Sequence, residues 1–390
     1  MLKKSVPMFL FILLVGCSST LPQITSFPES GVTITPEIIA TNKIVPTLTG
    51  MPTSKPEELN ILEQCLTITP DIGALSGKDY GTIVFDLPDS RMNGKLTDPY
   101  LYEPGNNYRT SLDGYDFSIS LDRTKFAYLP DPGKLLVTDK SGKILATIPT
   151  QHDSIVRWEN DGLILERANT HFFLNPFTGA RKELSEDFPN RYISEDYFSG
   201  IYLDIYYDPT LAEVIYFAKD KATNEFYFSL WDIPSNKEIV RIPQVGFGDY
   251  GFPAAWSSDS EQVIIRVLQG RDQYNLVSIH KDGQVETILP KNTGAFSLSP
   301  DNKHLVFWLY DEARKNWSLS TMNLQTKEVV DYCIKSKYFP KTPIWSPDSQ
   351  NLVIEVSSDN GENTVASLID LEKNLAVQIA EDAKPVGWLR

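Results

Sequence analysis

The chain has 390 residues, of which 41% are hydrophobic and 22% are charged, and its formal net charge is −15 at pH 7. A chain this acidic is unsuited to binding nucleic acid or an anionic bilayer surface through its charge. The length is ample for a folded domain with a large apolar core.

Residues 1–16 have the pattern of a signal peptide. Two lysines precede an apolar run over residues 8–15, which is too short for a bilayer that needs ~20 residues. The run ends in Leu-Val-Gly-Cys17, which resembles the lipobox of bacterial lipoproteins. The resemblance implies that Cys17 is lipidated and holds the protein outside the cytoplasm, on the outer membrane or the outer face of the cell membrane. The alternative is an ordinary signal peptide that contains a cysteine.

Residues 17–57 are predicted to be a disordered tether that begins with the lipidated cysteine. Six prolines and eight threonines lie between residues 18 and 57, and so polar a segment cannot bury enough apolar surface to fold. The folded domain is expected to span residues 58–390. Four apolar side chains near its start are available to pack against the rest of it, namely Ile61, Leu62, Leu66 and Ile68.

A short pattern recurs from residue 119 to the end of the chain. Its clearest copy spans residues 344–356, where Ser346-Pro347-Asp348 separates two apolar runs. Proline suits the second position of a type I turn, and the Ser and Asp side chains can bond nearby backbone amides. A marker residue three before the Asp recurs every 39 to 51 residues, close to the ~40–50 residues of a four-stranded propeller blade. The markers are Ile119, Trp158, Ile205, Trp256, Leu298, Trp345 and, without its Asp, Trp388.

The pattern predicts an all-β fold, a single seven-bladed β-propeller with four-stranded antiparallel blades, although six or eight blades are possible. Trp388 has no blade after it, whereas strands at 81–87 and 99–103 have no marker before them. The C-terminal strand should therefore complete the first blade and close the ring, which protects the sheet edges. The tryptophan markers are expected to pack between blades and not to form a sugar-binding surface.

Cys65 and Cys333 are the two cysteines that remain beside Cys17. In an oxidising compartment they could form a disulfide that fastens the start of the folded domain to blade six. Two buried, unpaired thiols are the alternative, and the sequence does not decide between them.

One set of candidate ligand-binding residues lies at the ends of the second strands. Aligned copies place charges there at Asp86, Glu166, Arg266 and Glu355. Such strands should be covered on both faces by neighbouring blades, so charges are unexpected. We expect the four side chains around the mouth of the central channel. The alternative is that they form ion pairs between blades or reach solvent.

A second set lies in two long connections at the same end of the propeller. Residues 185–200 and 244–253 are rich in aromatic side chains, as recognition loops often are. The candidates are Tyr192, Tyr197, Phe247 and Tyr250. The alternative is that these connections fold over blade edges and pack there.

No motif in the sequence predicts a catalytic residue, a metal site or a cofactor. The four histidines lack metal-binding spacing, and no Walker loop, Cys-x-x-Cys pair or nucleophile elbow occurs. An enzymatic function would have to use the charges at the ends of the second strands.

The turns Ser299-Pro300-Asp301 and Ser346-Pro347-Asp348 resemble those of the WD40-like propeller repeats of the TolB family. That resemblance covers about residues 120–390 and implies an exported, non-enzymatic propeller that acts through protein contacts. The chain departs from TolB in its seven predicted blades, where TolB has six, and in lacking TolB's extra N-terminal α/β domain.

The sequence therefore predicts a membrane-anchored extracytoplasmic lipoprotein whose propeller is a binding scaffold for a protein, peptide or glycan. A propeller-type carbohydrate-active hydrolase or lyase is the alternative, with Asp86, Glu166, Arg266 or Glu355 as acid and base. A purely structural component of the cell envelope is a third possibility.

Overall fold

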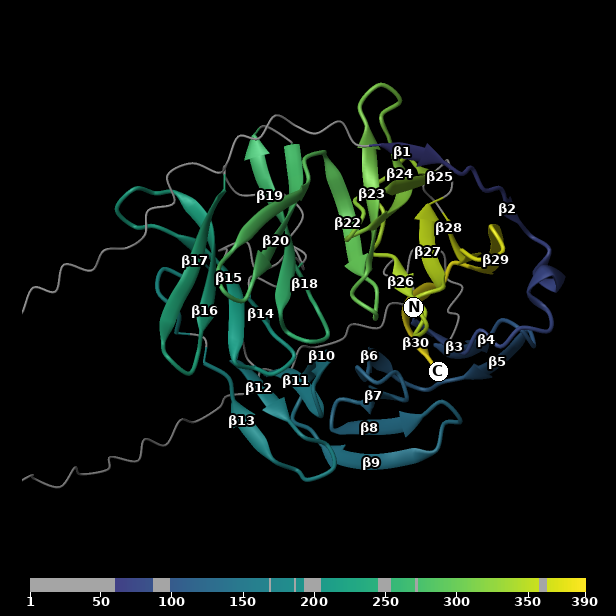
Figure 1. Cartoon of the computed structure of the whole chain (residues 1–390). Coiled ribbons are helices and arrows are strands. Elements are labelled where there is room, and N and C mark those ends of the chain that lie inside the picture. Colours follow the sequence, from purple (N-terminus) through teal and green to yellow (C-terminus); the bar gives the residue numbers. More distant parts are fainter. Residues whose placement is uncertain are drawn as a thin grey trace, which may run out of the picture. The chain divides into compact units, whose positions relative to one another are not determined.

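The structure is a computed structural model that describes residues 60–86, 99–167, 170–185, 187–192, 205–244, 254–270, 273–357 and 363–390. The predicted signal peptide, lipidated Cys17 and tether lie outside these residues. Within residues 50–390, the strands form seven antiparallel sheets, the blades of a propeller (Figure 1). The prediction of a seven-bladed propeller is confirmed. In the described part of the chain, no helix is long and apolar enough to cross a membrane.

The strands of each blade follow one another from the centre outward, and the first strands of neighbouring blades contact each other around most of the ring (Figure 1). Blade one contains β30 (Lys384–Leu389), β3 (Thr82–Asp86), β4 (Tyr100–Glu103) and β5 (Tyr108–Ser111). Blade two contains β6 (Tyr115–Ile119), β7 (Lys125–Asp131), β8 (Lys134–Asp139) and β9 (Ile144–Pro149). Blade three contains β10 (Ser154–Glu159), β11 (Gly162–Arg167), β12 (Thr170–Leu174) and β13 (Arg181–Glu183). Blade four contains β14 (Ile205–Tyr207), β15 (Glu213–Lys219), β16 (Phe226–Asp232) and β17 (Lys237–Gln244).

The last three blades follow the same order. Blade five contains β18 (Ala254–Trp256), β19 (Gln262–Gly270), β20 (Gln273–His280) and β21 (Val285–Leu289). Blade six contains β22 (Thr293–Leu298), β23 (His304–Asp311), β24 (Asn316–Asn323) and β25 (Val329–Ser336). Blade seven contains β26 (Ile344–Trp345), β27 (Asn351–Ser357), β28 (Thr364–Asp370) and β29 (Leu375–Glu381).

The Ser-x-Asp turns connect the first and second strands as the sequence predicts. In blade seven, Ser346 Oγ donates to Asp348 Oδ1 at 2.5 Å and accepts the amide of Asn351 at 2.9 Å. Ser120, Ser257 and Ser299 accept the equivalent amides at 2.9–3.0 Å. The residue after the Asp has a positive φ, 61° at Ser349 and 58° at Asn302. The repeated side-chain bonds therefore hold a tight turn that includes one left-handed residue.

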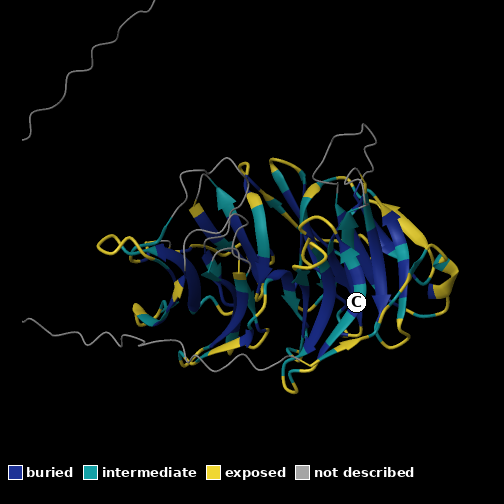
Figure 2. Ribbon diagram, turned by 90° about the horizontal axis from the view of Figure 1, so that it is seen from above, coloured by how far each residue is buried: buried dark blue, intermediate teal, exposed yellow. Residues whose placement is uncertain are grey.

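These turns share one end of the propeller with the turns between third and fourth strands. Backbone bonds join the two kinds of turn within a blade, as from the Leu324 amide to the Lys303 carbonyl at 2.9 Å and from Leu371 to Gln350 at 3.1 Å. We call this end the turn face. Figure 2 shows the buried residues along the strands and most exposed residues at turns and outer edges.

Two of the tryptophan markers join neighbouring blades through their indole N–H groups. Trp256 Nε1 donates to the Tyr206 carbonyl in blade four at 3.2 Å, and Trp345 Nε1 donates to the Ser297 carbonyl in blade six at 3.1 Å. Trp158 and Trp345 are 4% and 3% exposed. The prediction that these side chains pack between blades is confirmed.

The C-terminal strand closes the ring. β30 pairs antiparallel with β3, with Leu389 opposite Thr82 and Trp388 opposite Ile83. Trp388 is fully buried, and its Nε1 donates to the Tyr80 carbonyl at 2.6 Å. Gly81 has a φ of 74°, and a Cβ there would lie 2.3 Å from the Leu389 carbonyl oxygen, so only glycine fits this seam.

The segment before β3 runs along the outer strands of blades six and seven. β1 (Ile61–Glu63) pairs parallel with β25, and β2 (Ile68–Thr69) pairs parallel with β29, so both blades gain a fifth strand. A 3₁₀ turn, η1 (Ile72–Leu75), then leads to blade one. Ile61, Leu66 and Ile68 pack against the blades as expected, but Leu62 does not, because it is 45% exposed.

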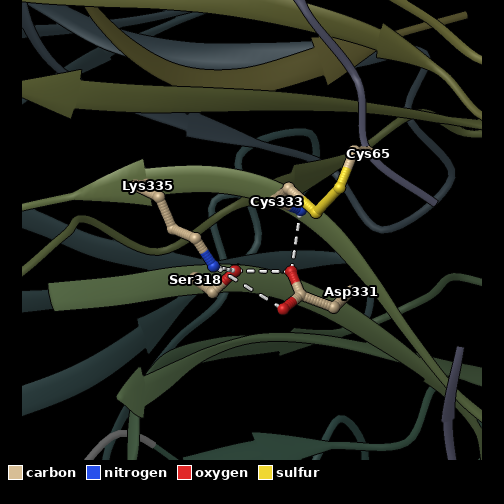
Figure 3. Close-up of a disulfide and its surroundings, with 5 residues drawn as sticks. All are labelled: Cys65, Ser318, Asp331, Cys333 and Lys335. Atoms are coloured by element: carbon tan, nitrogen blue, oxygen red, sulfur yellow. Dashed lines mark hydrogen bonds and ion pairs between the residues drawn. A yellow bond between two sulfur atoms is a disulfide. The ribbon is translucent and has the colours of Figure 1, made fainter. Parts of the chain in front are cut away.

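Cys65 and Cys333 form a disulfide between this segment and β25, with their Cα atoms 4.7 Å apart (Figure 3). Of the two alternatives left open by the sequence, the structure contains the bond to blade six. Cys333 has a φ of 58°, and Asp331 Oδ1 accepts its amide at 2.8 Å. Asp331 also accepts a 2.5 Å bond from Ser318 Oγ, and Lys335 Nζ lies 3.7 Å away (Figure 3). The carboxylate thus fixes the strand on which the disulfide is built.

Candidate binding face

The end of the propeller opposite the turn face carries the connections between blades and the turns between second and third strands. These two kinds of connection are also joined by backbone bonds, as from the Tyr310 amide to the Asn292 carbonyl at 3.0 Å and from Asp382 to Thr364 at 2.9 Å. We call this end the loop face. The charged ends of the second strands and the long connections of the sequence prediction belong to it.

Two carboxylates and an ammonium group meet where blades one and two begin on the loop face. Asp86 and Lys384 are opposite each other at the ends of β3 and β30. Asp116 lies at an irregular point of β6, with a φ of 55°. Burial raises the pKa of the Asp116 carboxyl, and repulsion from Asp86 adds to this, while a bond from the Ile155 amide and the charge of Lys384 act in the opposite sense. Asp116 therefore has a raised pKa and lies near a second carboxylate, that of Asp86.

The sequence prediction included Asp86 but missed Asp116. The available signal was a charged side chain within the innermost strand, between Tyr115 and Phe117. Nothing in the repeat pattern marks it, because the irregularity of β6 depends on its pairing with β7.

Arg266 of β19 is only 1% exposed and lies between aromatic rings of the loop face. Its guanidinium carbon is 4.3 Å from the centre of the Tyr274 ring and 5.4 Å from that of Phe339. Burial lowers the pKa of Arg266 to about 10, against the attraction of Tyr274 and Tyr206. The group therefore remains a cation at neutral pH, stabilised by the faces of the rings.

Aromatic side chains extend from Arg266 across blade six. The ring centres of Tyr310 and Trp317 are 4.8 Å apart, and those of Trp317 and Phe339 are 5.2 Å apart. Phe339 is 37% exposed, and its neighbour Tyr338 is 41% exposed. We call Tyr310, Trp317, Tyr338 and Phe339 the aromatic patch. Tyr310, Trp317 and Phe339 are held by mutual packing, and partly exposed rings held in this way are suited to binding a partner, because little side-chain entropy is lost.

The aromatic patch was not predicted, because its members come from three separate segments. Tyr310 ends β23, Trp317 begins β24, and Tyr338 and Phe339 lie in the connection to blade seven. The sequence Lys-Tyr-Phe-Pro over residues 337–340 was the one local signal.

The four charges predicted at the channel mouth lie on four different blades. Asp86 is in blade one, Glu166 in blade three, Arg266 in blade five and Glu355 in blade seven, so no two share a sheet. Glu166 is opposite His171 in β12, and Glu355 is opposite Ala366 in β28. The three carboxylates are half-buried, whereas Arg266 is covered by its rings. Their joint role in ligand binding stays a prediction.

Of the aromatic candidates in the long connections, Tyr192 is described. Its ring centre is 5.3 Å from that of Phe226 and 6.0 Å from that of Phe217, both in edge-to-face geometry. This places Tyr192 against the second and third strands of blade four. Tyr197, Phe247 and Tyr250 lie outside the described residues. Within the described ranges, no group of three or more His, Cys, Asp and Glu side chains could hold a metal ion.

No protein-family model matches the sequence, and no curated protein matches it. The structure is similar to TolB from Acinetobacter baumannii, with 13% identity and a TM-score of 0.45, over 77% of this chain and 63% of TolB. It thus spans less than two thirds of that TolB chain. An oligogalacturonate lyase in complex with manganese has 9% identity and a TM-score of 0.48, over 77% of this chain and 85% of its own. Hydrazine synthase from Kuenenia stuttgartiensis has 12% identity and a TM-score of 0.39, over 73% and 81%. These are similarities of propeller fold alone.

Proposed function

We propose that the protein is an exported, lipid-anchored propeller that binds a protein, peptide or glycan through its loop face. The observation that carries the binding proposal is the aromatic patch. Trp317 packs against both Tyr310 and Phe339, and Phe339 lies over Arg266, yet Phe339 and its neighbour Tyr338 remain more than a third exposed. Partly exposed aromatic side chains on a rigid base are typical centres of binding energy.

The disulfide supports export. Bonds of this kind persist in oxidising compartments and are rare in the cytosol. The Cys65–Cys333 bond joins residues 268 positions apart, so folding must bring the two cysteines together before the bond can form.

Lipidation of Cys17 is proposed from the resemblance of residues 14–17 to a lipobox. Metabolic labelling with palmitate tests it: the wild type should be labelled and Cys17→Ala should not, and label retained in the variant would refute the anchor.

The binding proposal is tested with the full-length protein in mild detergent. The wild type and a Trp317→Ala/Phe339→Ala variant are incubated with envelope extract and with a glycan array. We expect specific retention by the wild type and loss of about tenfold or more in the variant, as for removal of central interface residues. A matched control, Leu121→Ala, removes an apolar side chain that is 45% exposed on the turn face and should bind normally. Equal retention by all three proteins would refute the proposal.

A carbohydrate-active hydrolase or lyase is a second candidate because of Asp116. A half-buried carboxyl with a raised pKa beside an ionisable partner is the arrangement of an acid–base pair. Incubation with glycan polymers should then release products with the wild type and not with Asp116→Asn. Undiminished turnover in Asp116→Asn, or no turnover of any glycan by the wild type, would reject this role.

A further inference from the structure

The segment over residues 60–69, which we call the strap, is attached to the outside of the propeller by two short strands and a disulfide. It contains β1, β2 and the four residues between them, and all of its residues are half-buried or exposed. Its backbone bonds to blade six include one from the Gln64 amide to the Asp331 carbonyl at 2.8 Å. With so little surface buried, the strap depends on the Cys65–Cys333 bond to stay in place (Figure 3).

The strap covers two outer strands that have more buried residues than most. β5, β9 and β13 contain no buried residue, whereas β25 and β29 each contain four. Ile61, Leu66 and Ile68 of the strap pack against the apolar side chains of these blades. An apolar strand edge that loses its cover pairs readily with another strand. We therefore expect a strand to replace the strap wherever the strap is released.

The strap can separate from the ring at one exposed point. Pro70 and Asp71 follow it and are exposed, whereas Leu75, at the end of η1, is fully buried in the core of blades one and seven. Asp71 Oδ1 accepts the Gly73 amide at 3.0 Å, so local hydrogen bonds hold the chain from Asp71 onward. Pro70 and Asp71 are thus the hinge about which the strap would move.

Reduction of the disulfide releases the covalent link at the strap. Cys65 is exposed, so a dithiol reductant can reach the bond. The dithiol attacks one sulfur as a thiolate, forms a mixed disulfide and then closes to its own disulfide, while Cys65 and Cys333 become thiols. Two electrons and two protons pass from the dithiol to the cysteine pair. The strap is then held by its short strands and its side-chain packing alone.

We propose that the strap is an exchangeable strand through which two copies of this chain associate once the disulfide is reduced. The strap of each copy then covers β25 and β29 of the other, with Ile61 opposite Val329 as in the single chain. A second copy is the favoured occupant because it carries the one segment that these edges are shown to fit, so exchange needs no new complementary surface. Reoxidation links Cys65 of one chain to Cys333 of the other and fixes the dimer.

Isotope labelling of the full-length wild type tests the exchange without any substitution. Unlabelled and ¹⁵N-labelled proteins are mixed in mild detergent, reduced with dithiothreitol, reoxidised, alkylated and digested. A disulfide peptide that joins a light Cys65 to a heavy Cys333, or the reverse, reports a bond between two chains. We expect such mixed peptides to increase about tenfold or more over a sample kept oxidised, and to increase with protein concentration, because exchange competes with return of each strap to its own chain. No increase over the oxidised sample would overturn the proposal.

A control variant separates exchange from chance collision of thiols. Cys65→Ser/Leu62→Cys moves the thiol three residues along the strap, to a position whose native side chain is 45% exposed. In a strap that pairs with β25, residue 62 is opposite Val330 and away from Cys333, so this variant should form about tenfold fewer mixed peptides with Cys333. Equal amounts from the variant and the wild type would show collision and would overturn the proposal. Neither result depends on ligand binding by the loop face or on lipidation of Cys17.

Discussion

The turn face and the loop face of the propeller are built in different ways. On the turn face, the same Ser-x-Asp hydrogen bonds recur in blades two, five, six and seven, with amide-to-Oγ distances of 2.9–3.0 Å. On the loop face, each connection is different, and the side chains that meet there come from distant segments, as in the aromatic patch. The turn face therefore repeats one hydrogen-bonded turn, whereas the connections of the loop face differ from blade to blade.

This difference shows where the protein is free to acquire a specific partner. In each Ser-x-Asp turn, the bond from the backbone amide to the serine Oγ lies within one blade. This bond between the first and second strands of one blade therefore does not depend on the other blades. The loop face can then change without loss of the ring. The seam between blades one and seven is a third environment, in which a single strand, β30, connects the two ends of the folded domain.

The largest effect is expected at the seam. Trp388→Ala removes a fully buried indole and its 2.6 Å bond to the Tyr80 carbonyl, and should lower the free energy of unfolding by about 3–5 kcal/mol. Chemical denaturation measures it. Trp317→Ala on the loop face is the matched control and should cost clearly less, because Trp317 is half-exposed. Equal costs would contradict the distinction between seam and loop face.

Reduction of the disulfide should have the next largest effect. Breaking the Cys65–Cys333 bond frees a closed loop of 268 residues in the unfolded chain and should lower the free energy of unfolding by about 2–4 kcal/mol. Denaturation with and without dithiothreitol measures the loss. The Cys65→Ser/Cys333→Ser variant should be insensitive to the reductant. If reduction leaves the denaturation midpoint of the wild type unchanged, the disulfide between the segment before β3 and β25 does not stabilise the propeller.

The repeated turns should each contribute a smaller amount. Ser346→Ala leaves the buried amide of Asn351 without its Oγ acceptor and should cost about 1–3 kcal/mol. Ser141→Ala is the control, because Ser141 makes a similar bond to Asp139 in an exposed turn. It should change stability little. If the two variants lose the same free energy of unfolding, burial does not determine how much the Ser346 hydrogen bond contributes to stability.

The smallest expected effect is a pH dependence from the same turns. The Ser257 hydroxyl, followed by the Glu261 amide, holds the pKa of the Asp259 carboxyl below its ordinary value despite partial burial. A lowered pKa stabilises the fold above the unfolded-state pKa of about 3.9, and this stabilisation is lost as the pH falls below it. The stability difference between wild type and Asp259→Asn should therefore shrink below about pH 4. A difference constant down to pH 2 would exclude the carboxylate as its source.

The predictable part of the fold is the part that repeats. Ser346 and Asp348 act within a few residues of each other, so their turn can be identified from sequence, and the tryptophan markers share its period. β1 and β2 are too short to show any periodicity, and their pairing with β25 and β29 depends on residues more than 260 positions away. The candidate site shows the same difference. Asp86 could be predicted from its position in the repeat. Asp116 could not, because its place depends on the irregular pairing of β6, and Phe339 could not, because it depends on contacts between separate segments.

The central claim is that the loop face binds a partner and the turn face does not. Hydrogen exchange on the full-length protein, with and without the material retained from envelope extract, tests this claim most directly. We predict slower exchange on binding around Tyr310, Trp317 and the 337–343 connection, with the hairpins at 299–304 and 346–351 unchanged. Slowing confined to those hairpins, or absent from the aromatic patch, would contradict it.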